Sequence, residues 1–289
     1  MRPFFIVNPI AGGGEAKESF NTVRSFLDVR GVEYGFVFTE EAGESVRLTE
    51  EAYKNGERFI VSVGGDGTLS EVAQALCGRE DAVLGICPFG TGNDFVRTLG
   101  IPKEPEKAAE LLLSGTPKPV DMGLAGERPF INVAGFGFDV DVVINTERYK
   151  GKFRGMLPYL LGVMKSMLHL RGIKVKLTAD GNVIEDNILL LAAANGTHFG
   201  GGMAVAPMAD PSDGYFDVCY IKKLGLLKFL WYLPSFVKGK HVGSKPFVYF
   251  RAKELKVECE STPLQLDGEL KEHTPISFRI LESALRIVC

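Results

Sequence analysis

This chain has few cysteines and no long hydrophobic segment, and both absences narrow the class of protein to which it can belong. The five cysteines are scattered, odd in number and without a CxxC pair, at Cys77, Cys87, Cys219, Cys259 and Cys289. This pattern fits reduced thiols in the cytoplasm better than it fits a disulfide framework. No uninterrupted apolar run approaches the ~20 residues that span a bilayer. We therefore expect a cytoplasmic protein that does not cross a membrane.

An excess of positive charge is also missing. The 289 residues include 33 Lys and Arg against 36 Asp and Glu, which gives a net charge of −3. A general nucleic-acid binder needs a basic surplus to contact phosphates, so no nucleic-acid partner is expected. The hydrophobic content of 45% is typical of a globular protein, and the length suits one or two domains. An anionic ligand must therefore be held by a local group of donors.

The first part of the chain alternates short apolar runs with segments of helical periodicity. Strands are predicted at residues 4–7, 35–38, 59–63, 83–87 and 119–122, and helices at 15–29, 44–54 and 68–76. Repeated strand–helix alternation predicts a parallel sheet with right-handed crossovers. Ligands of such sheets bind beyond the carboxyl ends of the strands.

From about residue 123 the pattern changes to short strands separated by Gly, Pro, Asn and Asp. This spacing predicts an antiparallel, strand-rich second domain. Helical inserts are expected at about residues 157–170 and 224–238. The boundary between the two domains is therefore placed near residue 125.

A glycine-rich turn at residues 64–68, Gly-Gly-Asp-Gly-Thr, lies between a strand and a helix. Glycine permits close backbone approach, so amide groups can converge on phosphate oxygens beside the helix N-terminus. Asp66 suggests a metal partner, because a bare carboxylate would repel phosphate. The alternative is an ordinary turn in which Thr68 is the N-cap and Glu71 closes a capping box. Both interpretations can hold together.

Two more glycine-rich turns follow predicted strands, at residues 8–14 and 88–95. Asn8 offers a side-chain amide to a ligand, whereas Asn93 or Asp94 could simply cap the next helix. Because all three turns follow parallel strands of one sheet, we expect them to face the same edge and to form one cleft. None of them matches the GxxxxGK[ST] phosphate loop or the GxGxxG dinucleotide motif.

The ordered set of motifs resembles the diacylglycerol kinase catalytic family, which includes bacterial lipid kinases and the sphingosine and ceramide kinases. The set comprises Asn-Pro-x-x-Gly at 8–12, Val-Gly-Gly-Asp-Gly-Thr-Leu-Ser-Glu at 63–71, Pro-x-Gly-Thr-Gly-Asn-Asp at 88–94, Asp-Pro-Ser-Asp-Gly-Tyr-Phe-Asp at 210–217 and Leu-Asp-Gly-Glu at 266–269. NAD kinases and phosphofructokinases share the glycine-aspartate turn alone. The five motifs in order extend over nearly the whole chain and are far more specific.

The resemblance implies an α/β nucleotide-binding domain with a parallel sheet, similar to phosphofructokinase and NAD kinase, and an antiparallel β-sandwich domain that flanks the cleft. We assign residues 1–125, completed by 281–289, to the first domain and residues 126–280 to the second. The implied reaction transfers the γ-phosphoryl group of ATP to a lipid hydroxyl, with Mg²⁺ as the metal. Diacylglycerol, which would become phosphatidic acid, is the acceptor that we favour.

Site residues carried over from the family fall into four groups. The ATP site would comprise Asn8, Pro9, Ile10, Ala11, Gly12, Thr39, Gly65, Asp66, Gly67, Thr68, Leu69, Ser70, Glu71 and Thr91. The carboxylates of Asp66, Asp94 and Asp121 would surround the catalytic Mg²⁺. Glu269 would be the general base, although residues 266–269 are equally typical of a hairpin with an Asp-Gly turn. A second, structural Mg²⁺ would bind Asp213 and the carbonyls of Asp210 and Tyr215, where the alternative is a turn.

The expected partners are a lipid substrate and the inner face of a membrane, which the protein would contact transiently. Residues 224–242 are aromatic and flanked by lysines, and residues 149–171 carry Lys150, Lys152, Arg154, Lys165 and Arg171 among apolar side chains. Each segment suits either an interfacial amphipathic helix or a helix packed on the sandwich. A homodimer is compatible with the sequence.

Two rival functions are kept. One is a kinase of a soluble acceptor such as NAD, against which stand the Asn-Pro opening and the Gly-Thr-Gly-Asn-Asp element. The other is a nucleotide- or lipid-binding protein without turnover. Against that rival, a binding protein has no need of a base such as Glu269.

Overall fold

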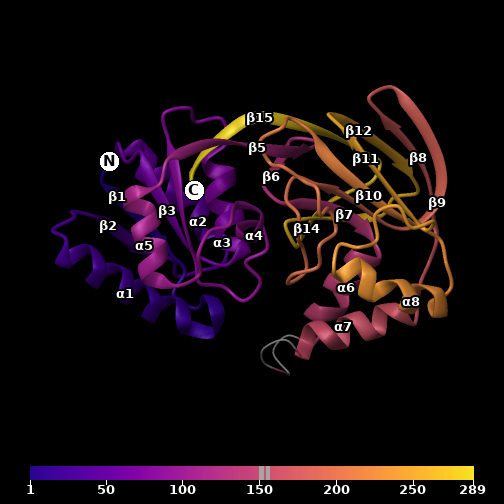
Figure 1. Cartoon of the computed structure of the whole chain (residues 1–289), viewed down its shortest axis with the longest axis horizontal. Coiled ribbons are helices and arrows are strands. Elements are labelled where there is room, and N and C mark those ends of the chain that lie inside the picture. Colours follow the sequence, from indigo (N-terminus) through magenta and orange to yellow (C-terminus); the bar gives the residue numbers. More distant parts are fainter. Residues whose placement is uncertain (150–152, 154–156) are drawn as a thin grey trace. The chain divides into compact units, whose positions relative to one another are not determined.

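A computed structural model describes residues 1–149, 153 and 157–289 of the chain. The backbone groups into two units, traced in Figure 1. Unit 1 comprises Met1–Met122, Pro211–Asp213 and Leu281–Cys289, and unit 2 comprises Gly123–Asp210 and Gly214–Ile280. The chain passes from the first to the second within β5 (Pro117–Ala125) and returns within β15 (Ile276–Val288).

The predicted parallel sheet is present in unit 1 with four of its five predicted strands. The fifth, residues 119–122, lies in β5 (Pro117–Ala125), which pairs with β15 and β6 instead. The strands of the sheet are β1 (Pro3–Val7), β2 (Gly35–Phe38), β3 (Phe59–Gly64) and β4 (Val83–Pro88), in the spatial order β4-β3-β1-β2. All three pairings are parallel, and the end of β15 adds a parallel contact to β4 between Ile287 and Leu84. The strands β3 and β4 are buried throughout, as expected for a sheet that is covered on both faces.

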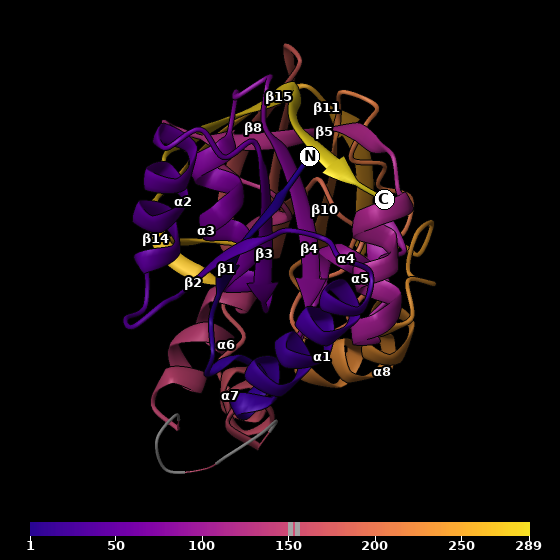
Figure 2. The ribbon, with the colours of Figure 1, turned by 90° about the vertical axis from the view of Figure 1, so that its left-hand side faces the viewer.

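Helices cover both faces of this sheet. They are α1 (Glu15–Val29), α2 (Glu44–Lys54), α3 (Asp66–Leu76), α4 (Phe95–Leu99) and α5 (Pro105–Ser114), with a short 3₁₀ helix η1 at Ala11–Gly14. Figure 2 shows α1 and α5 on one side of the strands and α2 and α3 on the other. On α1 the buried residues Ala16, Phe20, Val23 and Leu27 recur at helical spacing and pack on Phe5 and Val61 of the sheet.

Unit 2 is the predicted antiparallel sandwich. Its strands are β6 (Arg128–Phe130), β7 (Val133–Gly137), β8 (Ile173–Ala179), β9 (Asn182–Ala194), β10 (Phe216–Lys222), β11 (Phe247–Ala252), β12 (Glu254–Cys259), β13 (Pro263–Leu266) and β14 (Glu269–His273). The long strand β9 pairs with β8 through its first half and lies between β7 and β10 through its second half. Phe130, Phe136, Phe216 and Phe278 fill the core between the layers.

Three helices lie at the same end of unit 2 in both views: α6 (Phe138–Glu147), α7 (Leu157–Met167) and α8 (Leu226–Val237). On α8 the buried residues Phe229 and Phe236 pack in a cluster with Cys219 and Phe247. One face of α8 is therefore packed on the sandwich. Lys150, Lys152 and Arg154 lie outside the described residues. Among the helices that the structure describes, none is long and apolar enough to span a bilayer.

Candidate functional site

Three loops meet at the carboxyl ends of β1, β3 and β4. We call them loop 1 (residues 8–14), loop 2 (64–68) and loop 3 (88–94). The side-chain amide of Asn8 donates to Thr68 Oγ1 at 3.2 Å and so joins loops 1 and 2. Asp66 Oδ1 accepts a hydrogen bond from the backbone N–H of Asp94 at 2.6 Å, which joins loops 2 and 3. The loops are therefore linked to one another by direct hydrogen bonds, as the order of the strands requires.

Glycine is required where these loops touch. A Cβ on Gly90 would overlap the Cα of Gly65, and a Cβ on Gly12 would lie 2.6 Å from the carbonyl oxygen of Phe89. Gly92 is similarly close to Asp66, whose Oδ2 would be 2.6 Å from an added Cβ. The backbones of loops 1, 2 and 3 can pack together only because these side chains are missing, which is how a cradle of amide groups for phosphate is built.

Asn93 sets the shape of loop 3. It adopts φ of 52°, is 3% exposed, and donates from Nδ2 to the carbonyls of Pro88 at 2.9 Å and Gly90 at 2.7 Å. Its Oδ1 accepts the N–H of Gly90 at 3.1 Å. The sequence offered a helix cap as one interpretation of Asn93 and membership of the motif at 88–94 as the other. The motif Gly-Thr-Gly-Asn-Asp contained the signal, because asparagine tolerates the left-handed region.

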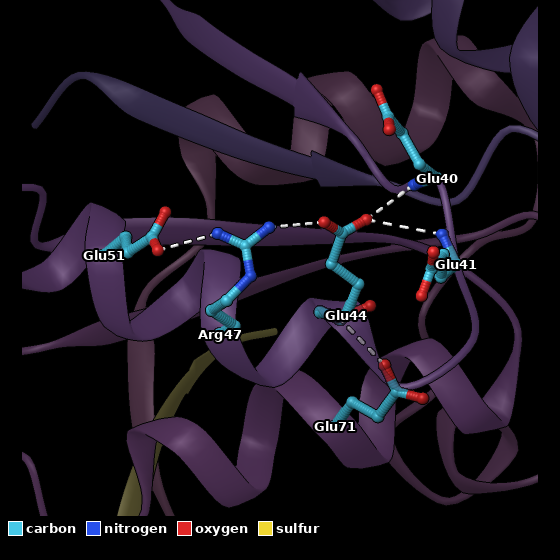
Figure 3. Close-up of polar contacts among 7 residues, drawn as sticks. Glu40, Glu41, Glu44, Arg47, Glu51 and Glu71 are labelled. Atoms are coloured by element: carbon cyan, nitrogen blue, oxygen red, sulfur yellow. Dashed lines mark hydrogen bonds and ion pairs between the residues drawn. The ribbon is translucent and has the colours of Figure 1, made fainter.

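The alternative of a capping box at the start of α3 is wrong. Helix α3 begins at Asp66, two residues before the predicted start, so Thr68 lies inside the helix and Glu71 lies beyond its first turn. Glu71 Oε2 instead accepts the N–H of Ser45 at 3.2 Å, in the first turn of α2 (Figure 3). Asp94 occupies the N-cap position of α4 but makes no capping hydrogen bond through its side chain.

The first turn of α2 is held by a second glutamate. Glu44 Oε2 accepts the N–H of Glu40 at 2.6 Å and that of Glu41 at 3.4 Å, and Glu44 also pairs with Arg47 (Figure 3). The Glu40 amide and then Arg47 lower the pKa of Glu44. Together with Glu71, this glutamate fixes the segment that follows Thr39, whose N–H donates to Val7 at 2.8 Å beside loop 1.

The other predicted ATP-site residues differ in exposure. Ile10 is 79% exposed, whereas Leu69 and Ser70 are buried in α3 at 3% and 5% exposure. Leu69 and Ser70 therefore belong to the buried part of α3, which follows loop 2. The residues whose backbones form the loop junctions are Gly12, Gly65 and Gly90.

Asp121 is buried in β5 and ties together separate segments of unit 1. Its Oδ1 accepts the N–H of Ser283 at 2.7 Å, and its own N–H donates to the carbonyl of Pro211 at 2.7 Å. Asp66 and Asp94 are joined directly, as described above, so two of the three predicted network residues are in hydrogen-bond contact. The place of Asp121 in that network stays a prediction.

Glu269 lies in unit 2, at the first position of β14. The pairing of Leu266 with Glu269 leaves a two-residue turn in which Asp267 and Gly268 have φ of 50° and 89°. This is the type I′ hairpin that an Asp-Gly pair predicts. The side chain of Glu269 is 49% exposed and pairs with Lys271 at 2.9 Å. The hairpin therefore presents Glu269 to solvent while fixing its backbone.

The turn that carries Glu269 is anchored from beneath. The carboxylate of Asp267 accepts three backbone N–H groups, from Ile131 and Asn132 at 2.9 Å each and from Val133 at 3.2 Å. Gln265 Oε1 accepts the N–H of Gly268 at 2.7 Å. These bonds connect the hairpin to the start of β7, so its position is set by the core of the sandwich.

A buried carboxyl group supports Gln265. Asp139 Oδ2 accepts a hydrogen bond from Gln265 Nε2 at 3.2 Å, and among the described residues its other oxygen has no hydrogen-bond partner. Burial raises the pKa of Asp139 to about 7, an effect that the Gln265 hydrogen bond only partly offsets. Sequence reasoning missed Asp139, because its burial and its partner Gln265 depend on contacts with distant residues.

Residues 210–215 form a turn directly before β10. The ring of Tyr215 lies under Arg251 and Lys253, at 4.5 Å and 5.1 Å from its centroid. Within the described part of the chain, no group of three His, Cys, Asp or Glu residues is arranged to hold a metal. The predicted site uses one carboxylate, from Asp213, and backbone carbonyls of Asp210 and Tyr215, and it stays a prediction.

The donor set near the loops fits Mg²⁺. Asp66 and Asp94 bring carboxylate oxygens to the place where loops 2 and 3 meet. Mg²⁺ is commonly bound by one or two carboxylates together with substrate phosphates and water. Two aspartates beside glycine loops rich in backbone amides therefore suit a Mg²⁺ ion that is also bound by the phosphates of a ligand. They suit a metal ion held by protein side chains alone less well.

Two family models match the chain. The model of the diacylglycerol kinase catalytic domain matches residues 2–125. The model of the YegS C-terminal NAD kinase beta sandwich-like domain matches residues 132–289.

Curated relatives extend over almost the full length. A diacylglycerol kinase of Bacillus subtilis is 31% identical, over 99% of this chain and 96% of the relative. A probable YegS-like lipid kinase of Pseudomonas aeruginosa is 36% identical, over 86% of this chain and 82% of the relative.

Solved structures share the fold. A Bacillus anthracis protein solved as a candidate diacylglycerol kinase superposes with a TM-score of 0.81 at 27% identity, over 99% of this chain and 96% of the other. Yeast NADH kinase in complex with NADH gives a TM-score of 0.52 at 10% identity, over 100% of this chain and 83% of the other, which shows a likeness of fold alone.

Proposed function

The chain belongs to the diacylglycerol kinase catalytic family, and from this membership we propose that it transfers the γ-phosphoryl group of ATP to the hydroxyl group of a membrane lipid, with diacylglycerol as the acceptor. Membership makes it a kinase and confirms the resemblance that the five motifs indicated. The nucleotide, the metal and the particular lipid are the proposed part.

The observation that carries the proposal is the junction of the three loops. Loops 1, 2 and 3 lie at neighbouring strand ends and are held together at Gly12, Gly65 and Gly90. Backbone amides at such turns, together with the N-terminus of α3, favour an anionic polyphosphate. A triphosphate bound there would be oriented through backbone contacts, which suits phosphoryl transfer because that reaction depends on positioning and charge neutralisation.

Asp66 and Asp94 are the side chains that would hold Mg²⁺ beside the phosphates. When bound, Mg²⁺ neutralises charge on the phosphate oxygens during transfer. The contact between Asp66 and the Asp94 amide holds the two aspartates together before any ligand binds. Asp121, which anchors Ser283 and Pro211, is kept as the third member of the proposed network.

Glu269 is the proposed general base. Its carboxylate would take the proton of the lipid hydroxyl while the hydroxyl oxygen bonds to the γ-phosphorus and the bond to the β-phosphate oxygen breaks, which releases ADP. The rigid hairpin supports this role, because Asp267 and Gln265 hold the turn through four backbone N–H groups. The hairpin leaves this carboxylate at the surface, where it pairs with Lys271 at 2.9 Å.

The test is the transfer of labelled phosphate from ATP to diacylglycerol in mixed micelles. Glu269→Gln removes the base, and we expect a loss of about a hundredfold or more in kcat. Glu258→Gln is the matched control, because Glu258 also lies on a strand of unit 2 and pairs with a lysine two residues away, Lys256, at 3.1 Å. Transfer by the Glu269 variant at the wild-type rate would refute the assigned base. Transfer to NAD but not to lipid would refute the acceptor.

A further inference from the structure

Charge is distributed very unevenly along this chain. Residues 148–179 and 218–253 contain 16 of the 33 Lys and Arg residues and none of the 36 Asp and Glu residues. The remaining 17 basic and 36 acidic residues leave the rest of the chain strongly negative. Both basic segments belong to unit 2, and they contain the helices α7 and α8. A protein with a net charge of −3 thus carries two helices inside purely cationic stretches.

Both helices expose apolar side chains at helical spacing. On α7 and the residue that follows it, Leu157, Leu160, Met164 and Leu168 are 44%, 52%, 65% and 73% exposed. The spacing of three and four residues places all four on one stripe. An apolar stripe on the solvent side of a helix is unusual, since water-facing helix surfaces are normally polar.

The helix α8 repeats this arrangement. Leu227, Leu230 and Trp231 are 84%, 43% and 81% exposed, whereas Phe229 and Phe236 on the opposite face are buried. The exposed stripe also contains the lysine Lys228 and is followed by Lys238 and Lys240, all exposed. Because the inner face of α8 is packed on the sandwich, its outer face is presented on a fixed support.

The two stripes belong to neighbouring helices. In Figures 1 and 2, α7 and α8 lie at the same end of unit 2. Met167, the last residue of α7, with Leu168 and Leu170 after it, lines one open cavity of about 460 Å³ together with residues 223–226, which lead into α8. We call the seven exposed side chains the apolar face: Leu157, Leu160, Met164, Leu168, Leu227, Leu230 and Trp231.

We infer that the apolar face inserts into the surface of an anionic lipid bilayer, with Leu227 and Trp231 entering the boundary between headgroups and acyl chains. The inference rests on the proposed function, because a kinase of membrane lipids must reach its substrate at such a surface. Tryptophan and leucine are the side chains that bind this boundary best, and the lysines around them attract anionic headgroups.

Charge complementarity selects a bilayer over a second copy of the chain. Two copies that met through the apolar face would bring together the exposed lysines of α8 and of the residues that follow it, Lys228, Lys238 and Lys240 of each copy. Like charges brought together in this way repel each other. An anionic bilayer supplies the opposite charge on every side of the inserted residues.

Trp231 makes the inference directly measurable, because it is the only tryptophan in the sequence. Vesicles of phosphatidylcholine and phosphatidylglycerol in equal amounts should shift its emission to shorter wavelength, and brominated lipid should quench it. Vesicles of phosphatidylcholine alone should bind roughly ten- to a hundredfold more weakly, because each lysine at an anionic surface contributes about fivefold. Emission unchanged by both kinds of vesicle would overturn the inference.

Leu227→Glu should weaken binding to the anionic vesicles roughly ten- to a hundredfold, since it removes a fully inserted leucine and adds a negative charge. Leu113→Glu is the matched control, because Leu113 is 42% exposed on α5 of unit 1. Both positions are at the surface, so thermal unfolding should be unchanged. Equal binding by both variants would overturn the inference, as would self-association without lipid that Leu227→Glu abolishes.

The assay separates this inference from the proposed function. Diacylglycerol in detergent micelles is available without a bilayer, so Leu227→Glu should retain activity there and lose it on vesicles. Wild-type activity in micelles together with a Trp231 emission that anionic vesicles do not alter would overturn the docking face alone. A shift of Trp231 emission with no phosphorylation of any lipid would support the docking face and refute the kinase.

Discussion

Gly90→Ala should damage both the stability and the activity of unit 1, because it places an atom where two backbones already touch. The added Cβ would overlap Gly65 Cα and lie 2.9 Å from Gly65 N. Both are backbone atoms of loop 2, so no side chain can rotate away. Loops 2 and 3 would have to separate by roughly 1 Å, a change that overpacking data associate with about 1–3 kcal/mol of unfolding free energy.

A separation of this size also disturbs the hydrogen bond of 2.6 Å between Asp66 and the Asp94 amide. A misplacement of about 1 Å in a positioning group can lower kcat/KM by about a hundredfold. The midpoint of thermal unfolding should fall by about 4 °C for each kcal/mol, or about 4–12 °C. Differential scanning calorimetry measures the first effect, and phosphate transfer to micellar diacylglycerol measures the second.

Two further glycines make the comparison quantitative. A Cβ on Gly65 would lie 3.2 Å from Gly90 Cα, a milder conflict, so Gly65→Ala should cost less stability than Gly90→Ala. Gly225→Ala adds an atom in open space at negative φ and should stay within about 0.5 kcal/mol of the parent. If the Gly90→Ala variant had the same unfolding midpoint and the same turnover rate as the parent, the role assigned to the loop junction would be refuted.

Three other changes test separate contacts. The pKa of Asp139 in the folded protein is about 7, above the usual 3.8 of an aspartate. Stability should therefore fall by about 1.4 kcal/mol for each unit by which the pH rises between these values, and denaturant titrations of Asp139→Asn should lack this slope. Asp267→Ala should lower the free energy of unfolding by about 3 kcal/mol in the same denaturant titrations, because three backbone amides lose their acceptor. An unchanged unfolding midpoint would exclude a role for Asp267 in anchoring the hairpin. Glu71→Ala should lower the free energy of unfolding by about 1 kcal/mol, because the Ser45 N–H in the first turn of α2 loses its acceptor. Glu71→Gln keeps an acceptor and should lose less, and equal losses would contradict the role of Glu71 in capping α2.

Features that depend on short stretches of sequence were predictable. The apolar runs gave four parallel strands of unit 1 within one or two residues of their observed bounds. The Asp-Gly pair at 267–268 predicted the observed hairpin. Local chemistry decides these elements, because strand burial and turn conformation are set by a few adjacent residues.

Contacts between distant residues were not predictable in the same way. Glu71 was assigned to the ATP site, with a cap on its own helix as the alternative, yet its hydrogen-bond partner is Ser45, 26 positions earlier. Asp139 and Gln265 are 126 positions apart, and the residues next to either one do not indicate that they are hydrogen-bonded. The overlap of Gly65 with Gly90 likewise depends on the pairing of β3 with β4. The resemblance to a family identified the catalytic candidates but not the residues that hold them in place.

Unit 1 is assembled from segments that are far apart in the sequence and are therefore synthesised at different times. Its C-terminal stretch, Leu281–Cys289, leaves the ribosome about 160 residues after Met122, yet it supplies the Ser283 amide to Asp121 and pairs Ile287 with Leu84. A nascent chain therefore holds an unfinished unit 1 until unit 2 has been synthesised. Such long-range closure slows folding, and it delays kinase activity until β15 has been made.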